Sequence, residues 1–170
     1  MKSYRHRLRH GRLSRLSIVV PSLFLLIATA GCAATDDAPE APVPTPDAKA
    51  AKLCRNLDEA LPEKVDGLER NDPEPGSELT AAWGSPAIIL RCGVPWPDAA
   101  VKAKSNTATI DGVGWVAEQL DNGAQRLTTG GRLAYVEVTI PKDEVAKSGA
   151  GSLVDLAKPI KKAIPEGIAD

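Results

Sequence analysis

Histidine is nearly absent from this chain of 170 residues, because its two histidines, His6 and His10, both lie in the first ten positions. Any domain that follows therefore lacks a serine-histidine-aspartate or cysteine-histidine arrangement, and it lacks a histidine zinc site. A phosphate-binding glycine loop is missing too, since Gly130-Gly131 has no strand-loop-helix setting around it. We expect no metal and no cofactor, and we assign no catalytic residue.

Acidic residues are missing from the N-terminus. Six basic residues come first, and residues 16–30 then form an apolar run. This run is short for a membrane span and fits the hydrophobic region of a secretory signal peptide. Residues 1–31 hold six of the 21 basic residues and none of the 22 acidic ones, which leaves 15 against 22 and a net charge of −7. We therefore expect no nucleic-acid partner.

Cysteine is scarce, with three in the chain. Residues 87–92 follow a Gly-Ser-Pro turn and predict a strand that ends in Cys92. Period-two alternation places Ile88, Leu90 and Cys92 on the face that suits a core, and Arg91 on the other. A helix predicted over residues 48–61, capped by Asp47 and ended by Pro62, turns Cys54 inward. We infer a Cys54–Cys92 disulfide.

Two cleavage patterns overlap at the end of the apolar run. Residues 28–30, Ala-Thr-Ala, have the small-x-small form of an ordinary signal-peptidase site. Residues 29–32, Thr-Ala-Gly-Cys, resemble a bacterial lipobox in which Cys32 receives the lipid, although leucine is usual in place of Thr29. We favour the lipobox, because the disulfide leaves Cys32 as an odd thiol in an oxidising compartment. Simple secretion and an uncleaved single-span anchor are the alternatives.

The chain then divides into three parts. We expect a lipoprotein signal peptide over residues 1–31, the lipidated Cys32 with a tether over residues 32–47, and one extracytoplasmic domain over residues 48–170. The tether contains Asp36, Asp37 and Glu40 and has prolines at near-alternate positions from residue 39 to residue 46, which is typical of an extended, solvated spacer. Acyl chains such as palmitate on Cys32 would hold the protein on the outer face of the plasma membrane.

Turn signals separate the apolar runs of the second half. The pairs Asp111-Gly112, Asn122-Gly123 and Gly130-Gly131 predict two-residue hairpins, with type I′ geometry at the Asp-Gly and Asn-Gly pairs. The runs predict strands over residues 78–83, 87–92, 107–110, 113–120, 125–129 and 133–140. An apolar stripe over residues 152–164 predicts a helix that is kinked or restarted at Pro159. We expect an α+β domain: an antiparallel meander sheet of about five or six strands, with the N- and C-terminal helices on one face.

Several of these motifs together resemble a known family. They are the cysteine of an early helix, Leu61-Pro62, the run AWGxPAIxLRCG over residues 82–93, the hairpin from Gly112 to Trp115, and a valine-rich strand ending before Pro141. In this order, over about residues 54–164, they are similar to the actinobacterial envelope family catalogued as domain of unknown function 3515. The resemblance implies an exported protein attached to the membrane or anchored by lipid, and it implies no catalytic or binding residues.

Aromatic residues are also few, and only four follow residue 31: Trp83, Trp96, Trp115 and Tyr135. Trp83 and Trp115 flank regular elements and are expected in the core. Trp96 lies between two prolines and is the candidate binding contact, although packing over the edge of the core is the plainer interpretation. Arg91 is the second candidate, as an anion contact, with a cross-strand ion pair as the plainer interpretation.

Carboxylates are the catalytic groups that remain, namely Asp98, Asp111, Glu118 and Asp121. A suitably spaced pair hydrolyses glycosides, but surface charge and turn chemistry explain such residues more simply. We therefore expect a non-enzymatic binding or assembly module of the cell envelope, whose partner is an envelope protein or a wall polymer. The alternatives are a carboxylate-dependent, glycan-cleaving hydrolase and a structural spacer. A deep cleft between two acids would favour the hydrolase, and an apolar patch around Trp96 would favour the binding module.

Overall fold

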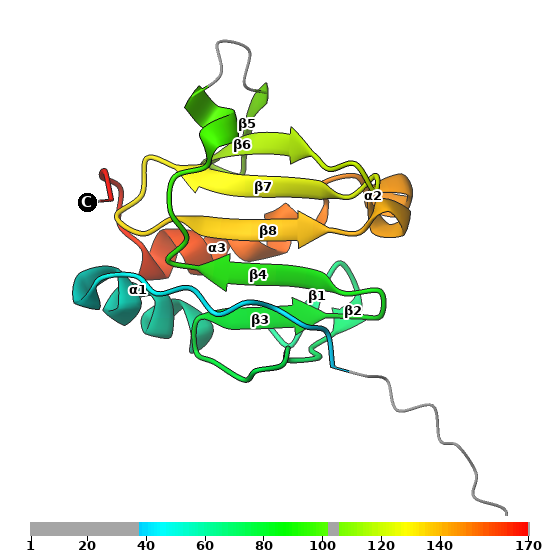
Figure 1. Ribbon diagram of the computed structural model, residues 1–170, viewed down its shortest axis with the longest axis horizontal. Helices are drawn as coiled ribbons and strands as arrows, with labels where there is room; N and C mark the ends of the chain where they lie inside the picture. The colour runs from blue at the N-terminus through cyan, green and yellow to red at the C-terminus, as the bar shows by residue number, and fades with distance from the viewer. Residues whose placement is uncertain (1–37, 102–105, 170) are drawn as a thin grey trace, which may run out of the picture. The chain divides into compact units, whose positions relative to one another are not determined.

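A six-stranded antiparallel sheet runs through the domain (Figure 1). The computed structural model describes residues 38–101 and 106–169. The strand order is β3-β4-β8-β7-β6-β5. Their bounds are β3 (Thr80–Trp83), β4 (Ile88–Cys92), β5 (Asn106–Ile110), β6 (Val113–Gln119), β7 (Gln125–Gly130) and β8 (Val136–Ile140). The predicted α+β class and antiparallel sheet are confirmed.

The order of the strands decides where one connection must run. Strands β5 to β8 form the predicted meander, which returns across the sheet until β8 pairs with β4. The chain leaving β4 therefore has to reach the far edge of the sheet before β5 can begin. Figure 1 shows this segment in green, passing in front of β8 and β7, and it contains the short 3₁₀ helix η1 (Asp98–Val101).

The three hairpins differ in their turns. Asp111 and Gly112 have φ values of 43° and 77°, as type I′ geometry requires. Residues 120–124 form a longer turn in which the Asn122 side chain accepts a hydrogen bond from the Ala124 N–H. Strand β8 begins only at Val136, so the connection after Gly130 is longer than two residues as well. The prediction of three two-residue turns is therefore right only at Asp111-Gly112.

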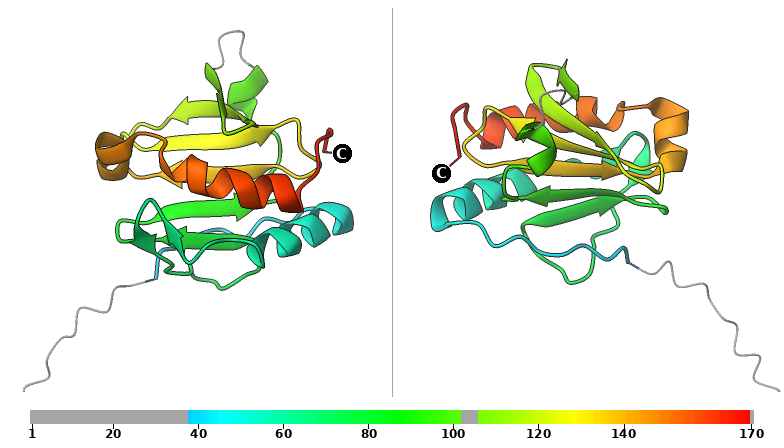
Figure 2. Two further views of the ribbon diagram at one scale, coloured as in Figure 1. Left: turned by 180° about the vertical axis from the view of Figure 1, so that it is seen from behind. Right: turned by 45° about the horizontal axis from the view of Figure 1, so that its top comes forward.

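Two helices, α1 (Ala48–Asp58) and α3 (Ser152–Ala163), cover one face of the sheet, which we call the helix face (Figure 2). Helix α1 begins where the Asp47 carboxylate accepts hydrogen bonds from the N–H groups of Lys49 and Ala50. Pro159 lies inside α3, which continues through it as one helix, so the restart considered there does not occur. A further short helix, α2 (Lys142–Ser148), follows β8 and was not predicted.

The disulfide between Cys54 of α1 and Cys92 of β4 is present, with the two Cα atoms 5.5 Å apart. Both cysteines are buried, and they join the helix layer to the sheet. Around them lies the core, formed by strand side chains on the helix face and by helix side chains that pack against them. Its largest fully buried members are Trp83, Trp115, Leu57, Ile88, Leu90, Ile140, Leu153, Leu156, Ile160 and Ile164. The expectation that Trp83 and Trp115 are core residues is confirmed.

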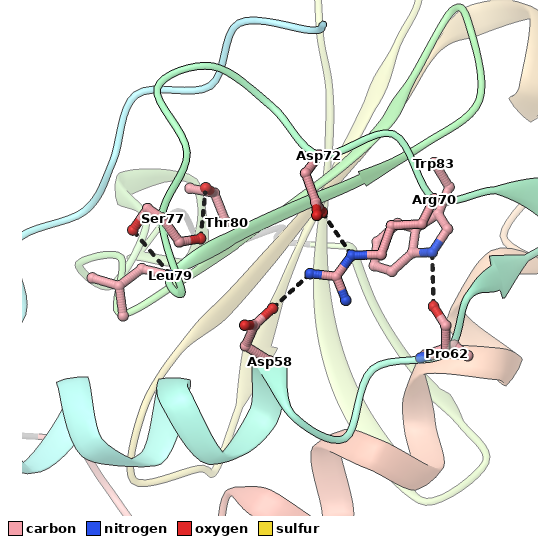
Figure 3. A network of polar contacts seen from close by, with 8 residues as sticks. All are labelled: Asp58, Pro62, Arg70, Asp72, Ser77, Leu79, Thr80 and Trp83. Carbon is pink, nitrogen blue, oxygen red and sulfur yellow. Dashed lines mark hydrogen bonds and ion pairs between the residues drawn. The ribbon is translucent and has the colours of Figure 1, made fainter.

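The segment between α1 and β3 is held by polar contacts (Figure 3). It contains a small hairpin of β1 (Lys64–Val65) and β2 (Leu68–Glu69). The Arg70 guanidinium then donates hydrogen bonds to Asp58 at 2.7 Å and to Asp72 at 2.6 Å. Burial by itself lowers the pKa of Arg70, but the bonds to Asp72 and Asp58 outweigh it and raise that pKa. The Trp83 indole donates to the Pro62 carbonyl at 3.0 Å, which fixes the start of the segment.

Residues 38–47, which we call the strap, pack on the domain instead of forming a solvated tether. The Ala41 N–H donates to the Glu74 carbonyl at 3.1 Å, and the Glu74 N–H donates to the Pro39 carbonyl at 2.9 Å. Ala41 and Pro44 are buried. Prolines keep the strap extended before it docks, so little conformational entropy is lost when it does. The prediction of a solvated tether is therefore wrong for residues 38–47, and its residues 32–37 lie outside the described residues.

Candidate binding groove

Four charged side chains of alternating sign cross the face of the sheet opposite the helices, which we call the open face. They are Arg91 of β4, Glu137 of β8, Arg126 of β7 and Glu118 of β6, and we call them the charge ladder. Arg91 lies directly opposite Glu137 at 3.0 Å, and Arg126 lies directly opposite Glu118 at 3.4 Å. Arg126 also lies 3.6 Å from Glu137. The cross-strand ion pair expected for Arg91 is confirmed.

Trp96 lies over this open face, on the segment that connects β4 to β5. Its ring packs against Tyr135 with centroids 4.9 Å apart and planes at 48°. A Cβ atom added at Gly130 of β7 would meet the Trp96 ring at 3.6 Å, so the indole also covers that strand. Trp96 is 39% exposed, whereas Trp83 and Trp115 are 0% and 1% exposed. Since the chain has three tryptophans, Trp96 is its one accessible indole.

Three depressions meet at Trp96. The first, of about 720 Å³, lies between the strap and the segment after β4, and Tyr135 lines it too. The second, of about 410 Å³, lies over the charge ladder. The third, of about 380 Å³, lies towards β5 and β6. The first two share Arg91, Val94, Pro95 and Trp96, and we call this pair the groove.

The strap forms one wall of the groove because a glycine, Gly93, directly follows β4. Gly93 has a φ of 86°, and a Cβ atom there would lie only 2.5 Å from Cγ of Pro46. A side chain at this position would push the strap away. Arg91 also binds the strap to the sheet, because its Nε–H donates to the Pro42 carbonyl at 2.9 Å. In the motif Leu-Arg-Cys-Gly, Arg91 is thus a member of the charge ladder, Cys92 forms the disulfide, and Gly93 allows the close approach of the strap.

Asp47 lies at the end of the strap and lines the first depression while capping α1. The N–H groups of Ala50 and Lys49 donate to its carboxylate, and these hydrogen bonds lower the pKa of Asp47 below its ordinary value. A negative charge at this end of the groove is therefore fixed by the helix cap and is present throughout the neutral range.

The structure brings together some of the predicted residues and separates others. Trp96 and Arg91 line the same two depressions, and Asp98 and Glu118 both line the second. Asp111 lies in the β5–β6 turn, 3.2 Å from Lys161 of α3. Asp121 lies in the β6–β7 connection. Cys32 lies outside the described residues.

Sequence reasoning missed Tyr135, Glu137 and Arg126, and it missed the strap as a wall. Alternation along the strands was a usable signal, because Glu137 and Arg126 fall on the face opposite the buried positions. That alternation cannot say which strands are neighbours. Only the pairing of β8 with both β4 and β7 makes one ladder of these residues.

The fold is thus an α+β domain with a polar groove on the open face of its sheet. The chain belongs to the family described as protein of unknown function (DUF3515), whose model matches residues 16–169. The membership of domain of unknown function 3515 that its motifs indicated is therefore confirmed. No curated protein and no solved structure matches the chain.

Two further findings concern the described part of the chain. None of its helices has the length and apolar character needed to cross a bilayer. Within the same residues, no three His, Cys, Asp or Glu side chains gather closely enough to hold a metal ion. The groups that remain in the groove are hydrogen-bond donors and acceptors beside an aromatic face, which is an arrangement suited to binding.

Proposed function

We propose that this protein is a non-enzymatic binding or assembly module of the cell envelope, and that its binding site is the groove at Trp96. The observation that supports this is the shared position of Trp96 and Arg91 on both depressions of the groove. Tryptophan and arginine are over-represented among residues that dominate binding energy. Here both are held in place before any ligand arrives, Trp96 by Tyr135 and Arg91 by Pro42 and Glu137.

We place the module on the outer face of the plasma membrane, held by a lipid on Cys32. The disulfide supports an oxidising compartment, and the apolar run at residues 16–30 supports export. Five residues separate Cys32 from the strap. Even when fully extended, these five residues span at most about 20 Å. A lipid-anchored domain would therefore stay close to the bilayer. The intact mass of protein extracted from membranes tests this, and an unlipidated chain beginning at Gly31 would contradict it.

Photo-cross-linking in intact cells tests the binding role. A photoreactive residue in place of Pro95, at the rim of the groove, would report what approaches the full-length chain. We expect capture of one specific envelope component, protein or polymer, and its loss in Trp96→Ala. The matched control is Val154→Ala, because Val154 is also exposed but lies on α3 and lines neither depression of the groove. Equal capture in both variants, or no capture at all, would contradict the proposal.

The carboxylate-dependent hydrolase is the alternative, and one observation favours it: Asp98 and Glu118 line the same depression. Against it, Glu118 is ion-paired with Arg126, and Glu137 is ion-paired with Arg91. The test is release of soluble sugar fragments from isolated cell wall by the purified chain. Release that is lost in both Asp98→Asn and Glu118→Gln would establish the enzyme and displace the binding module.

A further inference from the structure

The lining of the groove combines one flat apolar surface with many charged groups. The exposed large apolar side chains among the described residues are Trp96, Val101, Val154 and Ile168, and of these only Trp96 lines the groove. Five charged side chains lie beside it over the second depression: Arg91, Asp98, Glu118, Arg126 and Glu137. The core of a protein–protein interface is apolar and depleted of charge. A protein partner would bury these charges with little apolar area to offset their desolvation.

The charges of the groove do not favour an anionic ligand. Arg91 and Arg126 are balanced by Glu137 and Glu118 within the ladder. Asp98 and Asp47 then make the described lining acidic overall, as is the whole chain after residue 31. A phosphate-rich or uronic-acid polymer would meet net repulsion here. The lining therefore disfavours an anionic ligand, and its paired ladder charges offer hydrogen bonds to a polar one.

Sugar rings have the chemistry that fits this combination. A pyranose presents an apolar C–H face that lies flat on an indole, and its rim carries hydroxyls that both donate and accept hydrogen bonds. Guanidinium groups donate through several N–H groups in one plane, and carboxylates accept through two oxygens in one plane. We infer that the groove binds a neutral glycan chain, with one sugar ring stacked on Trp96 and neighbouring hydroxyls bonded to the charge ladder. This inference rests on the proposed function and names the ligand class of the same site.

The groove is also held rigid in a way that suits weakly held sugar rings. Trp96 stands between Pro95 and Pro97 and packs on Tyr135, so few of its rotamers remain to be lost. The ladder residues stand on strands, and each is fixed by a partner across the sheet. Ligand binding then costs little side-chain entropy. Two depressions join at Trp96, so a ring stacked there has room for further rings on both sides. Affinity should rise with chain length for this reason.

Titration of the full-length chain with defined sugars tests the inference. The probes are glucose, mannose and N-acetylglucosamine, the linear tetrasaccharide of each, and a sulfated glucan as the anionic comparison. We expect at least one neutral tetrasaccharide to bind by calorimetry, about tenfold or more tighter than its monosaccharide. Trp96 is the accessible indole, so the same sugar should shift tryptophan fluorescence and protect it from acrylamide quenching. Tighter binding of the sulfated glucan would overturn the assignment of a neutral ligand.

Variants separate recognition from folding. Trp96→Ala should weaken binding about tenfold or more, while Trp96→Phe keeps an aromatic face and should retain most of it. Asp98→Ala changes an exposed side chain of the groove and should weaken binding without lowering the melting temperature. Val154→Ala should bind as the wild type does. Unchanged affinity in both Trp96→Ala and Asp98→Ala would overturn the inference.

Failure of this inference is distinguishable from failure of the proposed function. If no neutral sugar binds but the cross-linker at position 95 captures a protein in a Trp96-dependent way, the ligand class is wrong and the binding module stands. If neither sugars nor any component is captured at the groove, both are overturned.

Discussion

The two faces of the sheet are built from the same strands, yet one carries the apolar core and the other carries the charge ladder. On strand β4, Leu90 points to the helix face and is 1% exposed, while its neighbours Ile89 and Arg91 point to the open face and are half-buried. On β8, Val138 lies in the core and Glu137 lies in the charge ladder. Residues that are consecutive in sequence thus contribute to the packed core on one side and to the proposed binding surface on the other.

If the proposed function is right, this difference separates the face that stabilises the domain from the face that binds the ligand. The helix face is held together by apolar side chains, whose burial from water is a non-directional interaction. A covalent disulfide adds to this stability. The open face uses paired charges whose directions are set by strand register. Changes on the helix face should therefore act on folding, and changes on the open face should act mainly on binding. Substitutions on each face test this division, and loss of the disulfide should have the largest effect.

Loss of the disulfide should be the most damaging change to the helix face. Cys54 and Cys92 are 38 residues apart, and closing a loop of this length is worth about 4 kcal/mol in the chain-entropy model. We expect Cys92→Ser, or reduction of the wild type, to unfold most of the domain at physiological temperature. Denaturant unfolding followed by circular dichroism, with and without reductant, measures the effect. An identical unfolding midpoint under both conditions would show that the bond is dispensable.

Neighbouring residues of β4 give the most direct comparison of the faces. Leu90→Ala empties a fully buried position and should lower the free energy of unfolding by about 3 kcal/mol. Ile89→Ala removes a half-buried side chain from the open face and should lower it by about 1 kcal/mol. The two substitutions are matched in size and lie on one strand. Equal losses in chemical denaturation would contradict the division of the faces.

Arg91 is expected to act on both stability and binding. Arg91→Ala removes the guanidinium that Glu137 accepts from at 3.0 Å, and it also releases the Pro42 carbonyl of the strap. Because Arg126 remains near Glu137, we expect a loss of only about 1–3 kcal/mol. Proteolysis near the strap should become faster. The double variant Arg91→Met, Glu137→Leu leaves no unpaired charge of this pair and should recover stability but not binding, whereas recovery of both would remove Arg91 from the site.

The smallest effect should be the pH dependence of the cap at Asp47. The pKa of Asp47 is lowered in the folded state, so the charged carboxylate stabilises the fold. This contribution is complete above the ordinary pKa of 3.8 and is lost as the pH falls through the lowered value. Asp47→Asn keeps a capping oxygen but does not titrate there, so its melting temperature should fall less steeply in acid. Parallel curves for the two proteins would show that the cap carries no pH dependence.

Much of the core could be predicted from the sequence, and less of the groove. The alternation in residues 87–92 predicted which residues of β4 are buried, and the burial pattern of the strand agrees. The small hairpin at β1 and β2 was overlooked although Asp66-Gly67 is a turn signal of the same kind as Asp111-Gly112. The order of prolines in the strap predicted an extended chain but not what it would pack on. Docking depends on Gly93 and Arg91, about fifty residues later in the chain.

By itself the sequence determined α1, α3 and the six strands of the large sheet, the two faces of β4, the helix cap and the pairing of the cysteines. The local features follow from interactions over a few residues. The cysteine pairing follows because Cys54 was the one cysteine expected to face the same core as Cys92. Only the tertiary structure decided that β8 lies between β4 and β7. That strand order also decided that the segment carrying Trp96 crosses the open face. Strand order is set by the combined packing of the whole sheet against α1 and α3. The groove exists because that packing brings Trp96, Tyr135, the strap and the charge ladder together from distant parts of the chain.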